Sequence, residues 1–195
     1  MPSAADDIAE AIDASGGALR FDRFVDLALY GPHGFYTATG RAGRRGDFIT
    51  SPEVGPLFGT LIARWIATEW RRLGEPDDFT IVEFGAGPGT LARSIMSAWE
   101  NDVMPRYVAV EVSADQRTSH PEHVESTGTA PSGPLRGVVI ANELLDNLPF
   151  RLLVFDGGWR EAHVARSGDR LVEVLHPIDD DLPGWLPASA PHGAR

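Results

Sequence analysis

The feature that most constrains the fold is the segment 79–90, "FTIVEFGAGPGT", in which a short apolar run ends in a carboxylate and glycines follow at alternate positions. The continuous apolar run around Ile81 and Val82 is typical of a strand buried on both faces. Beyond the glycines, Leu91 and Ile95 recur on one helical face. A strand, a glycine turn and a helix together predict a right-handed crossover to a parallel neighbour, and therefore an α/β fold.

Further strands are predicted after this helix. "RYVAVEVS" (106–113) and "GVVIANE" (137–143) read as buried parallel strands. The segment 150–175 alternates around Gly-Gly and Ser-Gly-Asp turns, which predicts an antiparallel hairpin or small meander.

Before the glycine turn the chain is predicted to be helical. Short helices are expected around 6–14 and 21–29, and Gly31 ends the second. A long helix is predicted to begin near residue 51 and to stop at Gly74. Its buried face is expected to carry two adjoining rows of apolar side chains: Leu57, Leu61 and Trp65, and Phe58, Ile62, Ile66 and Trp70.

Composition removes several function classes. The chain of 195 residues has no cysteine, and all 17 of its basic residues are arginine. These absences exclude thiolate zinc sites, a cysteine nucleophile, a Walker-type phosphate loop and a Schiff-base lysine. The net charge of −11 disfavours sequence-independent nucleic-acid binding. No apolar run approaches ~18 residues, so no membrane span is expected. The acidic first residues resemble neither a secretory signal nor a transit peptide, which predicts a cytoplasmic location.

The spacing of the glycines discriminates between ligands. A dinucleotide-binding turn needs G-x-G-x-x-G, but Thr90 occupies the position of its last glycine, so a nicotinamide reductase is the weaker alternative. The pattern present is Glu83, Gly85, Gly87 and Gly89. Glycines there let the backbone approach a ligand without a Cβ in the way.

Two acids flank this turn. Glu83 is expected to attract a ligand ammonium group, and Glu111, at the end of the next strand, to accept hydrogen bonds from both ribose hydroxyls. A ligand with an ammonium group, a ribose and no phosphate is S-adenosylmethionine, whose sulfonium also favours an acidic site. The alternative for each acid taken alone is a surface carboxylate at a strand end.

The strand 137–143 adds candidate chemistry where it ends. Because the carboxyl ends of parallel strands meet at one edge of a sheet, Asn142 and Glu143 should converge with Glu83 and Glu111. Asn142 is a candidate cofactor contact, and Glu143 and then Asp146 are candidate catalytic residues. The alternative is a capped helix start at Asn142 or Asp146.

Three blocks carry a resemblance to a known family. "GDFITSPEVGPLFG" (46–59), "VEFGAGPGTL" (82–91) and "ANELLDNLPFRLLV" (141–154), with "LALYGPHGFYTA" (27–38), resemble the MidA family of class I S-adenosylmethionine-dependent methyltransferases. The resemblance implies a Rossmann-like parallel sheet with the cofactor at the glycine turn, and a short strand near 123–126 as the third of the family's usual order. Mitochondrial members are protein arginine methyltransferases that act in assembly of respiratory complex I, which implies a protein arginine side chain as acceptor.

The resemblance also suggests further site residues. The block that contains Asp47, Thr50 and Ser51 approaches the cofactor in the family, and a helix beginning there could bind the methionyl carboxylate. The alternative is a well-capped helix alone. A pair of carboxylates, Glu143 and Asp146, could hold an acceptor guanidinium by bidentate hydrogen bonds. No metal site is expected, and "HPEH" (120–123) is interpreted as a polar loop.

The expected organisation is an N-terminal helical segment and cofactor lid (1–50), an α/β core that binds S-adenosylmethionine (51–150), and a hairpin with an irregular tail (151–195). Family members continue into further strands, so the predicted sheet lacks its C-terminal strands and has an open edge. A homodimer or a shortened chain would account for that edge. The alternative function is a scaffold that binds S-adenosylmethionine without activity.

Overall fold

The computed structural model describes residues 2–38, 51–101, 103–178 and 184–195. The chain forms two compact units. The sheet unit comprises Gly40–Asp146, and the terminal unit comprises Met1–Thr39 together with Asn147–Arg195. The division into three segments expected from the sequence stays a prediction.

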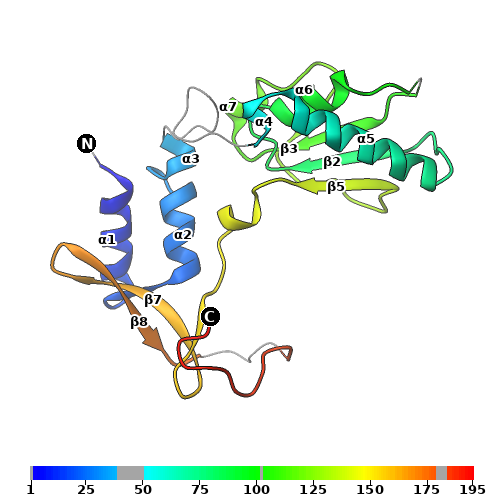
Figure 1. Ribbon diagram of the computed structural model, residues 1–195. Coiled ribbons are helices and arrows are strands. Elements are labelled where there is room, and N and C mark those ends of the chain that lie inside the picture. The colour runs from blue at the N-terminus through cyan, green and yellow to red at the C-terminus, as the bar shows by residue number, and fades with distance from the viewer. Residues whose placement is uncertain (1, 39–50, 102, 179–183) are drawn as a thin grey trace. The chain divides into compact units, whose positions relative to one another are not determined.

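The sheet unit is built on parallel strands, and Figure 1 shows α5 and α6 running across one face of them. The strands lie in the order β4-β3-β2-β5. Their bounds are β2 Thr80–Phe84, β3 Arg106–Val110, β4 Glu125–Thr127 and β5 Gly137–Ala141. The predicted Rossmann-like parallel sheet is thereby confirmed, including the short strand near residue 125. β5 lies at one edge of the described sheet, and a second copy covering it stays a prediction.

The helices of this unit are α4 (Ser51–Val54), α5 (Pro56–Arg72), α6 (Thr90–Ser97) and α7 (Ala114–Arg117). The single long helix predicted from residue 51 is therefore wrong, because it is interrupted at Gly55. Gly55 is extended, with φ 166° and ψ 178°. The residue before a proline is sterically disfavoured in the helical region, and Pro56 follows directly.

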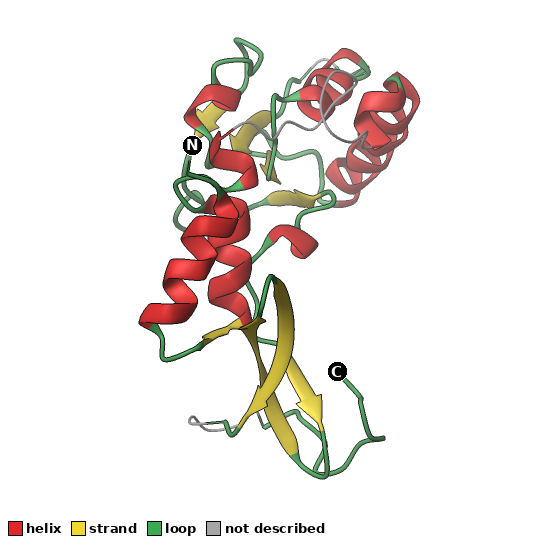
Figure 2. Cartoon of the chain, turned by 90° about the vertical axis from the view of Figure 1, so that its left-hand side faces the viewer, coloured by secondary structure: helices red, strands yellow, loops and turns green. Residues whose placement is uncertain are grey.

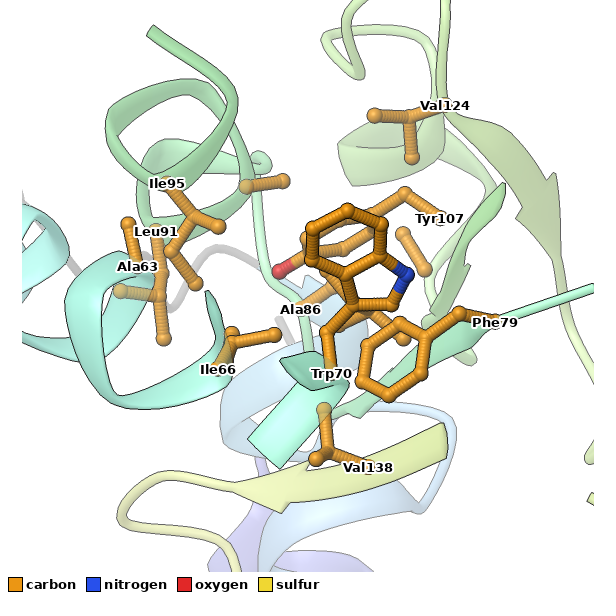
Figure 3. Packing of buried hydrophobic residues seen from close by; sticks show 13 residues of the cluster. Ala63, Ile66, Trp70, Phe79, Ala86, Leu91, Ile95, Tyr107, Val124 and Val138 are labelled. Atoms are coloured by element: carbon orange, nitrogen blue, oxygen red, sulfur yellow. The ribbon is translucent and has the colours of Figure 1, made fainter. Parts of the chain in front are cut away.

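One face of the sheet carries the main core. Buried side chains there include Ile66, Ile95, Tyr107 and Val138 (Figure 3). They come from α5, α6 and the strands beneath, so burying them fixes both helices on the sheet.

Only one of the two apolar rows predicted for α5 faces this core. Ile66 and Trp70 are buried, whereas Leu57, Leu61 and Trp65 are 70%, 54% and 51% exposed. Each residue turns a helix by about 100°, so the exposed row points about 100° away from the buried one. The expectation that both rows are buried is wrong.

The terminal unit combines helices with an antiparallel sheet; Figure 2, with helices in red and strands in yellow, shows its long twisted hairpin. β7 pairs with β1, β6 and β8. The elements are α1 Ala4–Ala14, β1 Ala18–Arg20, α2 Phe21–Tyr30, α3 Phe35–Ala38, β6 Leu153–Phe155, β7 Trp159–Ser167 and β8 Arg170–His176. The short 3-10 helix η1, Leu145–Asn147, lies where the chain passes from the sheet unit to the terminal unit. The predicted hairpin is confirmed, and β1 was not predicted.

A part-buried ion pair and a small apolar cluster stabilise the terminal unit. Glu161 on β7 is 4% exposed and receives both Nε (2.6 Å) and Nη2 (2.9 Å) of Arg151. Ile12 on α1 packs with Leu19 and Val164 from the sheet. Within the described part of the chain, no helix has the length and apolar character needed to cross a membrane.

Substitutions on the two faces of α5 should differ sharply in effect. Ile66→Ala removes a side chain that is 0% exposed, and we expect it to cost about 2–5 kcal/mol of unfolding free energy. Leu61→Ala, the matched control on the outer row, should change it by less than about 0.5 kcal/mol. Urea denaturation measures both. Equal losses would show that α5 is turned differently on the sheet.

Candidate functional site

The glycine turn between β2 and α6 is held in an unusual backbone conformation. Gly85, Gly87 and Gly89 have φ of 67°, 54° and 77°. Residues with a Cβ are disfavoured in this left-handed region, so the turn needs glycine at these points. The amides of Gly85 and Ala86 both donate to the carbonyl of Val110 (2.9 and 3.2 Å), which ties the turn to the end of β3.

Glu111 follows β3 directly and is bound to the same turn. It is 8% exposed. Its Oε2 accepts the amide of Gly87 at 2.9 Å, and its Oε1 accepts the amide of Ser113 at 2.8 Å. A carboxylate oxygen can accept more than one hydrogen bond, so both oxygens keep an acceptor position for a ligand hydroxyl. The structure therefore brings Glu111 and the glycine turn together.

Glu83 lies near the end of β2 and is more enclosed than Glu111. It is 3% exposed, and the phenol of Tyr107 donates to its Oε2 at 2.7 Å. Burial raises the pKa of Glu83 to about 7, the hydrogen bond from Tyr107 opposes this rise, and the charge of Glu111 adds to it. Burial, followed by the charge of Glu83, also raises the pKa of Tyr107. The two predicted acids therefore lie on the same side of the sheet unit, close enough to repel each other.

The chain after β5 also reaches the glycine turn. A Cβ added at Gly85 would lie 2.9 Å from Cδ1 of Leu144, so Leu144 packs directly on the turn. Glu143, the preceding residue, is exposed, and its backbone φ is +50°, a value that residues other than glycine rarely adopt. Asn142 is half-buried, and Asp146 is exposed within η1. The structure thus places Asn142 and Glu143 in the chain segment that packs on the turn.

The N-terminal block is only partly described. Asp47 and Thr50 lie outside the described residues. Ser51 is the exposed first residue of α4, a helix that packs against α5 and α6. A surface depression of about 400 Å³ lies between α5 and α6 and is lined by residues such as Thr60 and Arg93. No sequence-predicted site residue lines this depression.

Sequence reasoning missed three residues at the site: Tyr107, which donates to Glu83, and Leu144 and His120, which pack on the turn. Tyr107 could have been found, because a buried phenol needs a hydrogen-bond partner and Glu83, on the adjacent strand, needs a donor. His120 was interpreted only as part of a polar loop, but its Nε2 lies 2.8 Å from the carbonyl oxygen of Gly87. No local pattern predicts that long-range contact.

A parallel sheet with a glycine turn after β2 and an acid after the neighbouring β3 defines the class of α/β proteins that bind a nucleoside at the carboxyl ends of their strands. The family described as "Putative S-adenosyl-L-methionine-dependent methyltransferase" matches residues 61–192, more than half of the chain. The chain belongs to this family, and its resemblance to the MidA family is confirmed.

Similar proteins agree with this assignment. The protein arginine methyltransferase NDUFAF7 homolog, mitochondrial, of Drosophila melanogaster is 36% identical over 75% of this chain and 41% of its own length. The mitochondrial protein arginine methyltransferase NDUFAF7 of Xenopus tropicalis is 28% identical over 88% of this chain and 46% of its own. A crystal structure from Burkholderia thailandensis, with S-adenosyl-homocysteine bound, is 30% identical with a TM-score of 0.75, over 91% of this chain and 50% of its own.

These comparisons correct one expectation and set the extent of the match. The prediction of a cytoplasmic location is wrong, because the curated relatives from fly and frog are named as mitochondrial proteins. The acidic N-terminal residues were too indirect a basis for that prediction. The chain spans about half the length of these three proteins, between 41% and 50%.

Glu83 should make the protein less stable as the pH rises. Its pKa in the folded protein, about 7, lies above its ordinary value of 4.5, so the folded state binds this proton more tightly. The stability it contributes is full below pH 4.5 and is lost as the pH rises through 7. The loss is on the order of 3 kcal/mol.

Urea denaturation at pH 5 and pH 8 checks this expectation. Between these pH values the wild type should lose more unfolding free energy than Glu83→Gln, whose amide does not titrate. Glu122→Gln, which replaces an exposed carboxylate, is the control and should follow the wild type. If the difference in unfolding free energy between wild type and Glu83→Gln is the same at pH 5 and pH 8, Glu83 does not titrate in this range.

Proposed function

We propose that this protein is an S-adenosylmethionine-dependent methyltransferase whose acceptor is an arginine side chain of another protein. The observation that carries the proposal is the meeting of the left-handed glycine turn with Glu111 and with the Glu143–Leu144 segment. The curated relatives are named protein arginine methyltransferases, and the similar crystal structure has S-adenosyl-homocysteine bound. These names favour an enzyme over an inactive scaffold.

The residues of the turn fit an adenosyl amino acid. The glycine backbone is free of Cβ atoms where a ligand would approach, and Glu111 keeps acceptor positions for ribose hydroxyls. The two acids together favour a ligand that carries ammonium and sulfonium charges. When bound, S-adenosylmethionine supplies an electrophilic methyl group. Asp47, Thr50, Ser51 and Asn142 stay predicted cofactor contacts.

Glu143 is the first candidate for the residue that binds the acceptor guanidinium. Methyl transfer is an in-line displacement and needs positioning more than acid–base chemistry. The carboxylate of Glu143 would hold the guanidinium by charge-assisted hydrogen bonds, aim one nitrogen, and receive the proton which that nitrogen releases. The backbone of Glu143 has a φ of +50°, and strained backbone conformations of this kind cluster at functional sites. Asp146 is the second candidate for the same role.

Two measurements in sequence test the proposal. Calorimetry with S-adenosylmethionine should show binding to the wild type and weaker binding to Glu111→Ala, which loses both the ribose acceptor and the anchor of the turn. Transfer of a radiolabelled methyl group from the cofactor to an arginine-rich protein then tests activity. Binding without transfer to any arginine protein would favour the scaffold, and binding of NADH instead would favour a reductase.

Glu143→Gln should separate chemistry from binding. The amide keeps the shape of the side chain but lacks the charge that holds a guanidinium, so we expect turnover to fall roughly a hundredfold. The affinity for S-adenosylmethionine, measured by calorimetry, should stay within about twofold of the wild type. Glu122→Gln is the control and should leave both unchanged. An equal loss of affinity and turnover would reassign Glu143 to the cofactor site.

A further inference from the structure

His120 reaches the glycine turn from a distant part of the sequence. Its Nε2 lies 2.8 Å from the carbonyl oxygen of Gly87. Because a carbonyl oxygen only accepts hydrogen bonds, Nε2 must carry the proton. The amide of Gly87 donates to Glu111 at 2.9 Å. Both backbone polar groups of Gly87, its amide and its carbonyl, are therefore hydrogen-bonded to side chains.

The loop around His120 is packed on the turn and anchored there. A Cβ added at Gly89 would lie 3.1 Å from Cδ2 of His120 and 3.2 Å from Cδ of Pro121. The guanidinium of Arg93, on α6, donates to the carbonyl of Ser119 at 2.8 Å. The helix that follows the turn thus fixes the loop that carries His120.

Packing alone does not account for a histidine at this position. Among the described residues, Nδ1 of His120 is the buried side-chain nitrogen or oxygen without a hydrogen-bond partner. A buried polar atom without a partner costs stability, and an apolar side chain of similar shape would avoid that cost. What the imidazole provides here is the Nε2 proton that it donates to Gly87.

We propose that His120 is a positioning residue for the cofactor site. By holding the carbonyl of Gly87, it fixes the direction in which the turn and Glu111 face the ligand. Glycine has wide backbone freedom, so a turn without this hydrogen bond would have to be ordered when the ligand binds. That ordering would weaken affinity without touching the reacting atoms. The inference rests on the proposed function, since it takes the ligand to be the adenosyl cofactor.

A pair of near-isosteric variants isolates the donated proton. His120→Gln keeps an N–H that can reach Gly87, whereas His120→Met has similar length and no donor. We expect His120→Met to weaken binding of S-adenosylhomocysteine roughly tenfold by calorimetry and His120→Gln to restore most of the affinity. His123→Met, an exposed position in the same loop, is the control and should bind like the wild type. In the methyl-transfer assay, His120→Met should raise KM for S-adenosylmethionine with little change in kcat.

The outcomes separate this inference from the function it rests on. If the wild type binds S-adenosylhomocysteine and His120→Met binds it as tightly as His120→Gln, the positioning role is wrong while the proposed function stands. If the wild type does not bind S-adenosylhomocysteine, the positioning role and the proposed function are both wrong. Nitrogen-15 spectra of labelled histidine in the unmodified protein give a test that needs no variant: the proton of His120 should be on Nε2, and a proton on Nδ1 alone would overturn the inference.

Discussion

The site depends on the hydrogen bonds between the carboxylate of Glu111 and the backbone amides of Gly87 and Ser113. The turn belongs to neither a helix nor a strand, and its glycines are the residues with the greatest backbone freedom. Without Glu111 its middle residue would lose the bond that joins it to β3. The same carboxylate that shapes the turn also offers acceptor positions beside it, so structure and recognition use one side chain.

The neighbouring acid shows that a second carboxylate at the site has an energetic cost. Glu83 is buried and paired with the neutral phenol of Tyr107. An arginine partner would neutralise it, whereas a phenol satisfies one oxygen and leaves the charge available. Burial and the proximity of Glu111 both oppose ionisation, as the raised pKa of Glu83 shows. A cationic ligand would relieve that cost, which links the energetics of the two acids to the chemistry of the ligand proposed for the site.

Much of this arrangement could be predicted from the sequence, because local patterns determine it. The strand, glycine turn and helix at 79–97 and the acid at 111 follow from burial and from spacing along the chain. The contacts of Tyr107, Leu144 and His120 could not be read in the same way, since each depends on which distant segments meet in space. Gly55 precedes a proline, which disfavours the helical region there, but the prediction relied on capping signals near residue 51 and on the apolar periodicity from Leu57 onward, neither of which shows the break.

A crystal structure of this protein with S-adenosylhomocysteine soaked in tests the central claim most directly. We predict that the ribose hydroxyls lie within hydrogen-bond distance of the Glu111 carboxylate, with the amino-acid end of the ligand beside the glycine turn. Ligand density away from the turn, or a Glu111 carboxylate that contacts only backbone amides while the ligand lies elsewhere, would contradict the account.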